Sequence, residues 1–167
     1  MFATFRHLLL LIAIGLMSPQ IAIAKDFTLE GYFTGKTSAT GHFSAINGIK
    51  RDFTVDLTGR WNGKILTLRE DFLYSDGERD RKTWRFTKTG PSTYSGTRED
   101  VSGKVKVRIE GNTARFTYLV FLDSENRKNQ VRFWDKMVLG KNGKMLNTAL
   151  VTKFGFPVAK TTVKFQK

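Results

Sequence analysis

The sequence predicts one all-β domain, an antiparallel up-and-down β-barrel of about ten strands. Turn-forming dipeptides recur at a spacing of about ten residues, which is typical of short strands joined by hairpins. The clearest are Asn47-Gly48, Asn62-Gly63 and Asn142-Gly143, because Asn and Gly readily adopt the positive φ of a two-residue turn. The runs between the turns alternate apolar and polar residues, and none has helical periodicity over a useful length. A two-sheet sandwich is the alternative to the barrel.

The first 24 residues predict a secretory signal peptide. Arg6 precedes an apolar run from Leu8 to Met17, and small residues up to Ala24 have the spacing of a cleavage site. The run spans about ten residues, fewer than the roughly 20 that a membrane-spanning helix needs. We therefore expect cleavage after Ala24 and a mature domain over residues 25–167, with an uncleaved anchor as the alternative.

The mature chain would contain no cysteine and would be strongly basic. Without cysteine it can form no disulfide, and it lacks the residue that anchors a bacterial lipoprotein. Arg6 is the only charged residue before Lys25, so cleavage changes the formal net charge only from +13 to +12. Such a charge favours anionic surfaces, and for an exported protein we expect membrane phospholipid and no nucleic acid. A basic surface that only keeps the protein soluble is the alternative.

Period-two alternation gives each expected strand one buried and one wet face. Phe53, Val55 and Leu57 alternate with polar residues in one run, as do Val105, Val107 and Ile109 in another. The expected strands, one of which could be irregular, are residues 27–33, 40–46, 49–58, 64–74, 79–88, 93–101, 104–110, 114–122, 130–139, 144–152 and 160–166.

Two ionisable residues of opposite charge fall on the apolar face of neighbouring strands. Glu70 shares a face with Leu68 and Phe72, and Lys82 occupies the same face of the next strand. A reversal at Asp76-Gly77 would place Glu70 and Lys82 within one or two positions of direct pairing. We expect an inward ion pair between them.

Further polar side chains are expected on the inner face. A bare charge in a dry barrel costs several kcal/mol, so these groups must pair, become hydrated or meet a ligand. Three interpretations remain open: a buried salt-bridge network, a partly wet cavity that orients the head group of an apolar ligand, or a register error that leaves the groups in solvent. The candidate ligand-binding residues are Glu70, Lys82, Trp84, Tyr94, Arg98, Asp100, Tyr118 and Asp135.

The mature chain carries none of the common catalytic motifs. His42 would be its only histidine, which excludes a histidine-rich metal site. It has no cysteine nucleophile, G-x-S-x-G elbow, phosphate-binding glycine loop or dinucleotide fingerprint. We therefore expect no catalytic residues, no metal and no cofactor. Glu70 with Asp100 or Asp135 as an acid and base pair is the enzymatic alternative.

Several short segments of the mature chain share the pattern of a known family. They are Gly31–Gly35, Gly41 with Phe43, Leu68–Glu78 with Trp84, Tyr94–Gly96, Asp100–Gly103, Gly111-Asn112, Tyr118, Asp135 with Met137, Asn147, and Lys153–Phe156. Through them the chain resembles an uncharacterised bacterial family, domain of unknown function 3833. The resemblance implies an exported, lipocalin-like protein whose role is related to modification of membrane fatty acids, and it implies no catalytic residues.

The chain departs from the family pattern at two places. It lacks the cysteine of the many members that are lipoproteins, and Trp134-Asp135-Lys136-Met137 replaces an acidic-acidic-Trp-Met pattern. The first departure favours a protein that is free in the periplasm. The second leaves only Asp135 and Met137 as matching positions in that segment.

These observations favour a periplasmic, lipocalin-like protein of unknown function that binds a fatty acid or another amphiphile. Lys82 or Arg98 would meet an anionic head group, and Tyr94 or Tyr118 would donate hydrogen bonds. The alternative is an accessory protein with a filled core that associates with an anionic membrane or a partner enzyme. An apolar cavity of about 300 Å³ or more would favour the first hypothesis. The apolar lining is expected to include Leu68, Phe72, Trp84, Phe86, Phe116 and Phe133.

Overall fold

The protein is described by a computed structural model that covers residues 27–123 and 127–167. The expected signal peptide lies outside the described residues. The elements are α1 (Leu29–Phe33), β1 (Gly35–Ala45), β2 (Lys50–Trp61), β3 (Ile65–Tyr74), β4 (Arg79–Gly90), β5 (Thr93–Thr97), β6 (Val105–Glu110), β7 (Thr113–Phe121), β8 (Gln130–Leu139), β9 (Met145–Lys153) and β10 (Phe156–Gln166).

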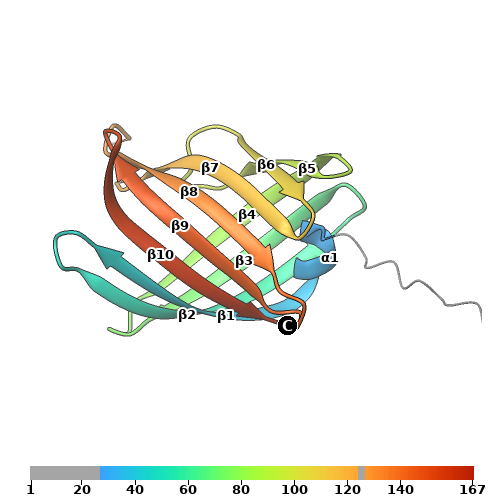
Figure 1. Ribbon diagram of the computed structural model, residues 1–167, viewed down its shortest axis with the longest axis horizontal. Coiled ribbons are helices and arrows are strands. Elements are labelled where there is room, and N and C mark those ends of the chain that lie inside the picture. Colours follow the sequence, from blue (N-terminus) through green and yellow to red (C-terminus); the bar gives the residue numbers. More distant parts are fainter. Residues whose placement is uncertain (1–26, 124–126) are drawn as a thin grey trace, which may run out of the picture.

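The ten strands form one closed antiparallel barrel (Figure 1). Each strand pairs with its neighbours in the sequence, and β1 pairs with β10 over Ser38 to Ala45 to close the sheet. Closure satisfies the backbone groups that an open sheet would leave at its edges. The predicted up-and-down barrel is therefore confirmed, and the sandwich is excluded.

The predicted inner faces are also confirmed. Phe53, Val55 and Leu57 of β2 are all buried, as are Val105, Val107 and Ile109 of β6. The predicted turn dipeptides lie between strands, and their glycines have positive φ, 88° at Gly48 and 93° at Gly63. These turns set the register of each hairpin. The apolar pattern reinforces that register, because a slip of one residue would turn every apolar side chain outward.

The first expected strand, residues 27–33, is wrong, because this segment forms the short helix α1. Thr28 caps the helix: its side-chain oxygen accepts a hydrogen bond from the backbone N–H of Gly31 at 3.0 Å. The helix buries Leu29, Tyr32 and Phe33 inside the end of the barrel. Burial against the ends of the strands thus outweighs the weak strand pattern of these residues.

Three other expected boundaries differ from the structure by four or five residues. β1 begins at Gly35, five residues before the expected start, and β10 begins at Phe156. β5 ends at Thr97, a turn follows at residues 99–100, and Val101 forms a bridge to Val120 of β7.

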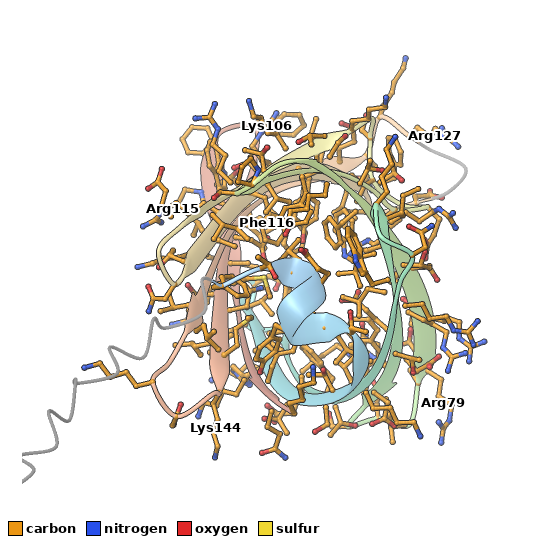
Figure 2. The ribbon with its side chains drawn as sticks, turned by 90° about the vertical axis from the view of Figure 1, so that its right-hand side faces the viewer. Arg79, Lys106, Arg115, Phe116, Arg127 and Lys144 are labelled. Atoms are coloured by element: carbon orange, nitrogen blue, oxygen red, sulfur yellow. The ribbon has the colours of Figure 1, made fainter. Side chains whose placement is uncertain are left out.

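Helix α1 fills one end of the barrel, which we call the closed end. Figure 2 looks into this end and shows α1 within the ring of strands, with Arg79 and Lys144 on the outside. Glu30 accepts hydrogen bonds from Lys88 Nζ at 2.6 Å and from Tyr94 Oη at 2.5 Å, which fix the helix to β4 and β5. The opposite end, at the left of Figure 1, is called the mouth.

Candidate ligand-binding cavity

The barrel encloses a cavity of about 460 Å³ that reaches from α1 to the mouth. The accessory-protein hypothesis requires a filled core, and the described residues do not form one. All six apolar residues expected to line a cavity do so. Seven of the eight candidate ligand-binding residues also line it: Glu70, Lys82, Trp84, Arg98, Asp100, Tyr118 and Asp135.

Tyr94 is the one candidate residue that does not line the cavity. Its side chain is 1% exposed, and its hydroxyl donates to Glu30 of α1. Burial and the carboxylate of Glu30 raise the pKa of Tyr94 well above its usual range. In the structure Tyr94 therefore holds the helix that closes the barrel, and its hydroxyl has a partner without any ligand.

The deep part of the cavity, near α1, is apolar. Leu29 and Phe33 of the helix line it, and the ring of Phe33 lies 5.6 Å from that of Phe165. Farther toward the middle, the ring of Trp84 lies 4.9 Å from that of Phe86 and 5.3 Å from that of Tyr118. This part of the cavity can surround an apolar chain and offers it few polar partners.

A charged cluster lies between the middle of the cavity and the mouth. Arg98 forms two hydrogen bonds to Asp100, at 2.5 Å from Nε and 3.2 Å from Nη2. Lys82 Nζ lies 3.1 Å from Asp80 and 3.4 Å from Asp100. The guanidinium of Arg98 also packs 4.8 Å from the centre of the Trp84 ring. Each cation of the cluster is thus already paired with a carboxylate.

The expected ion pair between Glu70 and Lys82 is wrong, although the two residues lie directly opposite each other in the β3–β4 ladder. Lys82 turns instead toward Asp80 and Asp100. Asp100 reaches it because Phe121 N donates to the carbonyl of Asp100 at 2.9 Å and so fixes the segment after β5 over the mouth. The pairing of two strands in a hairpin can be predicted from the sequence. The path of the segment after β5, which brings Asp100 to Lys82, cannot.

Glu70 faces the cavity without a hydrogen bond or ion pair among the described residues. Burial raises its pKa to about 7, because desolvation disfavours the charged form more than the nearby charge of Arg98 favours it. Its side chain is half-buried and lines the cavity that reaches the mouth. At neutral pH its carboxyl group can therefore either donate or accept a hydrogen bond.

A second buried acid lies opposite, on β8. Asn147 Nδ2 donates to Asp135 Oδ1 at 2.6 Å, and burial raises the pKa of Asp135 to about 6. Asp135 Oδ2 and Asn147 Oδ1 are both buried and form no hydrogen bond of good geometry with the protein, although the Tyr118 hydroxyl lies near enough to Asp135 to oppose the rise of its pKa. A buried oxygen without a donor is costly, so this pair calls for a water or a ligand group that donates.

Sequence reasoning missed Arg51 and Asp80 at the mouth, which also line the cavity, and it placed Tyr74 on the inner face without making it a candidate. Arg51 Nη2 pairs with Asp76 and Glu78, both at 2.7 Å, and its guanidinium lies 3.8 Å from the Tyr74 ring centre. A signal for them was present, since Arg51 and Asp80 continue the inner faces that contain Phe53 and Lys82. These residues form a polar collar on one side of the mouth.

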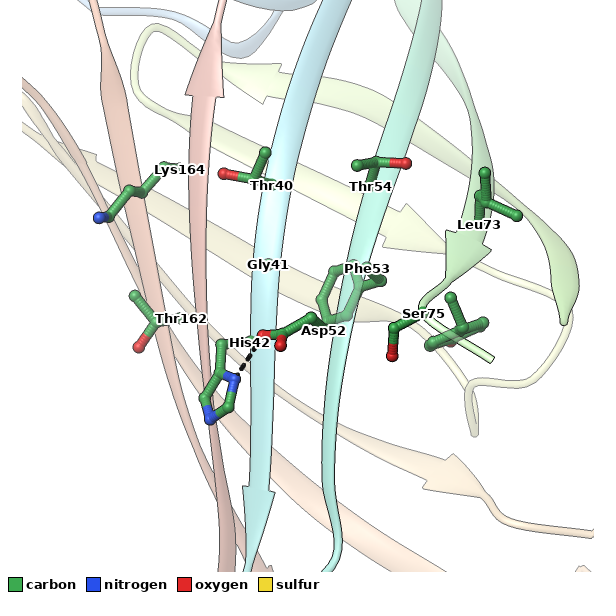
Figure 3. Close-up of a pocket in the computed structure, with 11 residues that line it drawn as sticks. Thr40, Gly41, His42, Asp52, Phe53, Thr54, Leu73, Ser75, Thr162 and Lys164 are labelled. Carbon is green, nitrogen blue, oxygen red and sulfur yellow. Dashed lines mark hydrogen bonds and ion pairs between the residues drawn. The ribbon is translucent and has the colours of Figure 1, made fainter. Parts of the chain in front are cut away.

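A shallow hollow of about 570 Å³ lies on the outside of the barrel, over β1, β2, β10 and the end of β3 (Figure 3). His42 and Asp52 from adjacent strands meet there, with Nδ1 and Oδ1 2.6 Å apart. None of the candidate residues lines this hollow. Within residues 27–123 and 127–167, no group of His, Asp and Glu side chains is arranged to hold a metal ion. No helix in the same ranges is long and apolar enough to cross a membrane.

The fold and the cavity define a lipocalin-like or calycin-like barrel with a polar group of residues inside an otherwise apolar interior. Two solved structures have a similar fold. The S-type phycobiliprotein lyase CPES from Guillardia theta matches with a TM-score of 0.59 and 10% identity, over 84% of this chain and 93% of that one. Rv2717c from M. tuberculosis matches with a TM-score of 0.54 and 10% identity, over 81% of this chain and 93% of that one.

The chain belongs to the family described as protein of unknown function DUF3833, whose model matches residues 12–167. No curated protein matches the sequence. The family resemblance seen in the sequence is therefore confirmed, and the structural likeness shows the fold.

Proposed function

We propose that the protein binds a fatty acid or a related amphiphile in its barrel, in the periplasm. The observation that carries this proposal is a cavity of about 460 Å³ that is apolar at the closed end and polar toward the mouth. Its volume is within the range of small-molecule sites. The likeness to the phycobiliprotein lyase supports a small-ligand role in general and no particular ligand.

The position of the polar groups supports an amphiphile that lies with its tail toward α1. Leu29, Phe33 and Phe165 would contact the tail, and Glu70 with Asp135 would face the part of the ligand nearer to the mouth. Because Arg98 and Lys82 are both paired with acids, a head group gains most by meeting the unpaired oxygens of Asp135 and Asn147. Hydroxyl groups or a protonated carboxyl group can supply the donors that these oxygens lack.

The periplasmic location is part of the proposal and rests on the predicted signal peptide and on the absence of a lipoprotein cysteine. Periplasmic extraction of the tagged protein, followed by N-terminal sequencing, tests it. A mature N-terminus at Lys25 is the expected result. Full-length protein in the membrane fraction would contradict it.

Filling the cavity tests the binding proposal. Ala149 is buried, lines the cavity and lies opposite Asp135 in the β8–β9 ladder, so Ala149→Leu adds apolar volume where the ligand would lie. We expect wild-type protein isolated from its own cells to carry a lipid in native mass spectrometry. We expect Ala149→Leu to carry at least about tenfold less, because overpacking of a filled site costs about 1–3 kcal/mol.

Thr148→Leu is the matched control, because Thr148 is the exposed neighbour on the outside of the same strand. It should retain as much ligand as the wild type. An empty wild-type protein that saturated fatty acids and lysophospholipids do not stabilise against heat would overturn the proposal. Equal retention by Ala149→Leu would show that the ligand lies elsewhere.

A further inference from the structure

The connections between strands at the mouth carry large apolar side chains that are exposed to solvent. Phe154 is 89% exposed and Ile46 is 79% exposed, which leaves almost their whole side chains in water. In the described ranges, the connections at the closed end carry no such exposed residue. We call the exposed residues at the mouth the apolar rim: Ile46, Ile49, Leu122, Phe154 and Phe156.

The apolar rim is one continuous stretch of the mouth. Its residues come from the β1–β2, β9–β10 and β7–β8 connections and from Phe156 at the start of β10, and these connections follow one another around the barrel. Ile46 N donates to the carbonyl of Val158 at 2.9 Å, which joins the β1–β2 connection to the start of β10, just after the β9–β10 turn. Leu122 belongs to the third and also lines the cavity. The rim therefore borders the opening through which the cavity meets solvent.

Phe154 occupies a backbone conformation that disfavours it. Lys153 pairs with Phe156, so Phe154 and Gly155 form a two-residue turn, with φ of 51° and 86°. Such turns strongly prefer Asn or Gly at the first position. Of the residues that the structure describes, Phe154 is the only one other than glycine with positive φ. Because Phe154 is strained and exposed, it contributes little to the core. A contribution to folding stability therefore does not explain why Phe occupies this position.

Basic residues flank the rim. Lys50 follows the β1–β2 connection, and Lys153 precedes Phe154, with its Nζ 5.8 Å from the centre of that ring. The formal net charge of the whole chain is +13. Apolar tips beside lysines match the interface of an anionic bilayer, where apolar groups enter the head-group region and cations meet phosphate.

We propose that the apolar rim docks on the surface of an anionic phospholipid bilayer, with Phe154, Phe156 and Ile46 inserted among the head groups and the cavity mouth facing the lipid. The acidic tip of the β3–β4 hairpin, with Asp76 and Glu78, lies beside the β1–β2 end of the rim, where Arg51 pairs with both acids, and it stays in water. This docking goes beyond the proposed ligand binding. It would hold for an empty barrel, so the two can fail separately.

Co-sedimentation with vesicles tests the docking. Protein isolated from the expressing cells is mixed with vesicles of phosphatidylglycerol and phosphatidylethanolamine, and with vesicles of phosphatidylcholine alone. We expect binding to the anionic vesicles that weakens several-fold when the salt rises from about 0.1 M to about 0.5 M, because salt screens exposed charges. No binding to anionic vesicles would overturn the proposal and leave a protein partner as the occupant of the rim.

Substitution of the rim distinguishes docking from general attraction by charge. The triple variant Ile46→Thr, Phe154→Asn and Phe156→Thr removes exposed apolar side chains and changes no charge. We expect it to bind anionic vesicles at least about tenfold more weakly. The single variant Phe154→Asn should keep or raise the midpoint of thermal unfolding, because Asn suits the turn better than Phe. If Phe154 had only a structural role, its replacement would lower stability. A loss of vesicle binding without a loss of stability therefore supports docking.

The matched control removes similar apolar side chains from the outer wall. Leu146 and Leu150 of β9 are 41% and 46% exposed, and both lie away from the mouth connections. Leu146→Thr with Leu150→Thr should leave vesicle binding unchanged. If this control weakens binding and the triple variant does not, the bilayer contacts the wall and the proposal is wrong.

Because the chain has no cysteine, a single introduced cysteine reports contact with lipid. Ile49→Cys in the rim and Lys141→Cys at the closed end each receive a polarity-sensitive dye. Only the dye at position 49 should shift its emission when anionic vesicles are added. A shift at position 141 alone would reverse the orientation and overturn the proposal.

Discussion

Glu70 is an acid that the barrel holds in an unfavourable place. Its strand register turns it inward, where β4 supplies Lys82 directly opposite, yet Lys82 pairs with Asp80 and Asp100. The inward direction of Glu70 follows from local alternation and was predictable. Its lack of a charged partner was not, because the competing Asp100 comes from a segment whose path depends on contacts with β7.

The raised pKa of Glu70 predicts a pH-dependent contribution to stability. The folded protein keeps the proton up to about pH 7, whereas the unfolded chain releases it near 4.5. This contribution is fully present below about pH 4.5 and is lost as the pH rises through 7. Glu70→Gln should therefore raise the free energy of unfolding at pH 8 by up to about 3 kcal/mol and change it little at pH 4.5.

Urea unfolding at both pH values measures this effect. Asp71→Asn on the outer face is the comparison, because ion pairs with Arg81 and Arg69 lower the pKa of Asp71. That variant should be slightly less stable than the wild type at pH 8. A gain for Glu70→Gln that does not grow with pH would contradict the assignment of Glu70 as a buried acid.

At the scale of elements, α1 shows how a short segment escapes sequence reasoning. Residues 27–33 have an apolar pattern compatible with a strand, and a helix of five residues leaves almost no periodicity to detect. The available signal was Thr28, a good helix cap, with Gly31 three residues later. Only the space inside the barrel end decides that this segment becomes a plug.

Gly59 of β2 predicts how α1 can be displaced. A Cβ at this position would overlap the carbonyl oxygen of Phe33, at the end of the helix. Gly59→Ala should therefore push α1 outward and lower the free energy of unfolding by about 1–3 kcal/mol. Thr58→Ala is the adjacent control and should change stability much less. Urea unfolding measures the stability of both variants. If Gly59→Ala were as stable as the wild type, α1 would be free to shift and the prediction would be wrong.

At the scale of the whole molecule, closure of the barrel makes the strands depend on one another. Each strand has hydrogen-bonded neighbours on both sides, and the charged cluster, the helix and the apolar lining share one interior. Loss of any strand would expose that interior. We therefore expect one cooperative unfolding transition.

Tryptophan fluorescence and far-ultraviolet circular dichroism should give the same urea midpoint. The fluorescence combines Trp84, which is 4% exposed and lies in the interior, with Trp61 and the 49% exposed Trp134 of the wall, whereas the dichroism reports all strands. Separate midpoints would mean that part of the barrel opens before the rest. The β6–β7 seam would then be the first place to examine, because only three residue pairs join these strands.

The sequence by itself determined that ten strands form and roughly where they lie, their turns and the inward direction of seven cavity residues, because alternation and turn chemistry act between neighbours along the chain. The tertiary structure alone decided that the barrel leaves a cavity, that α1 closes it, that Tyr94 holds α1 and that exposed apolar residues gather at the mouth. These features depend on how ten strands close and on which distant segments then meet. No local pattern in the chain contains that information.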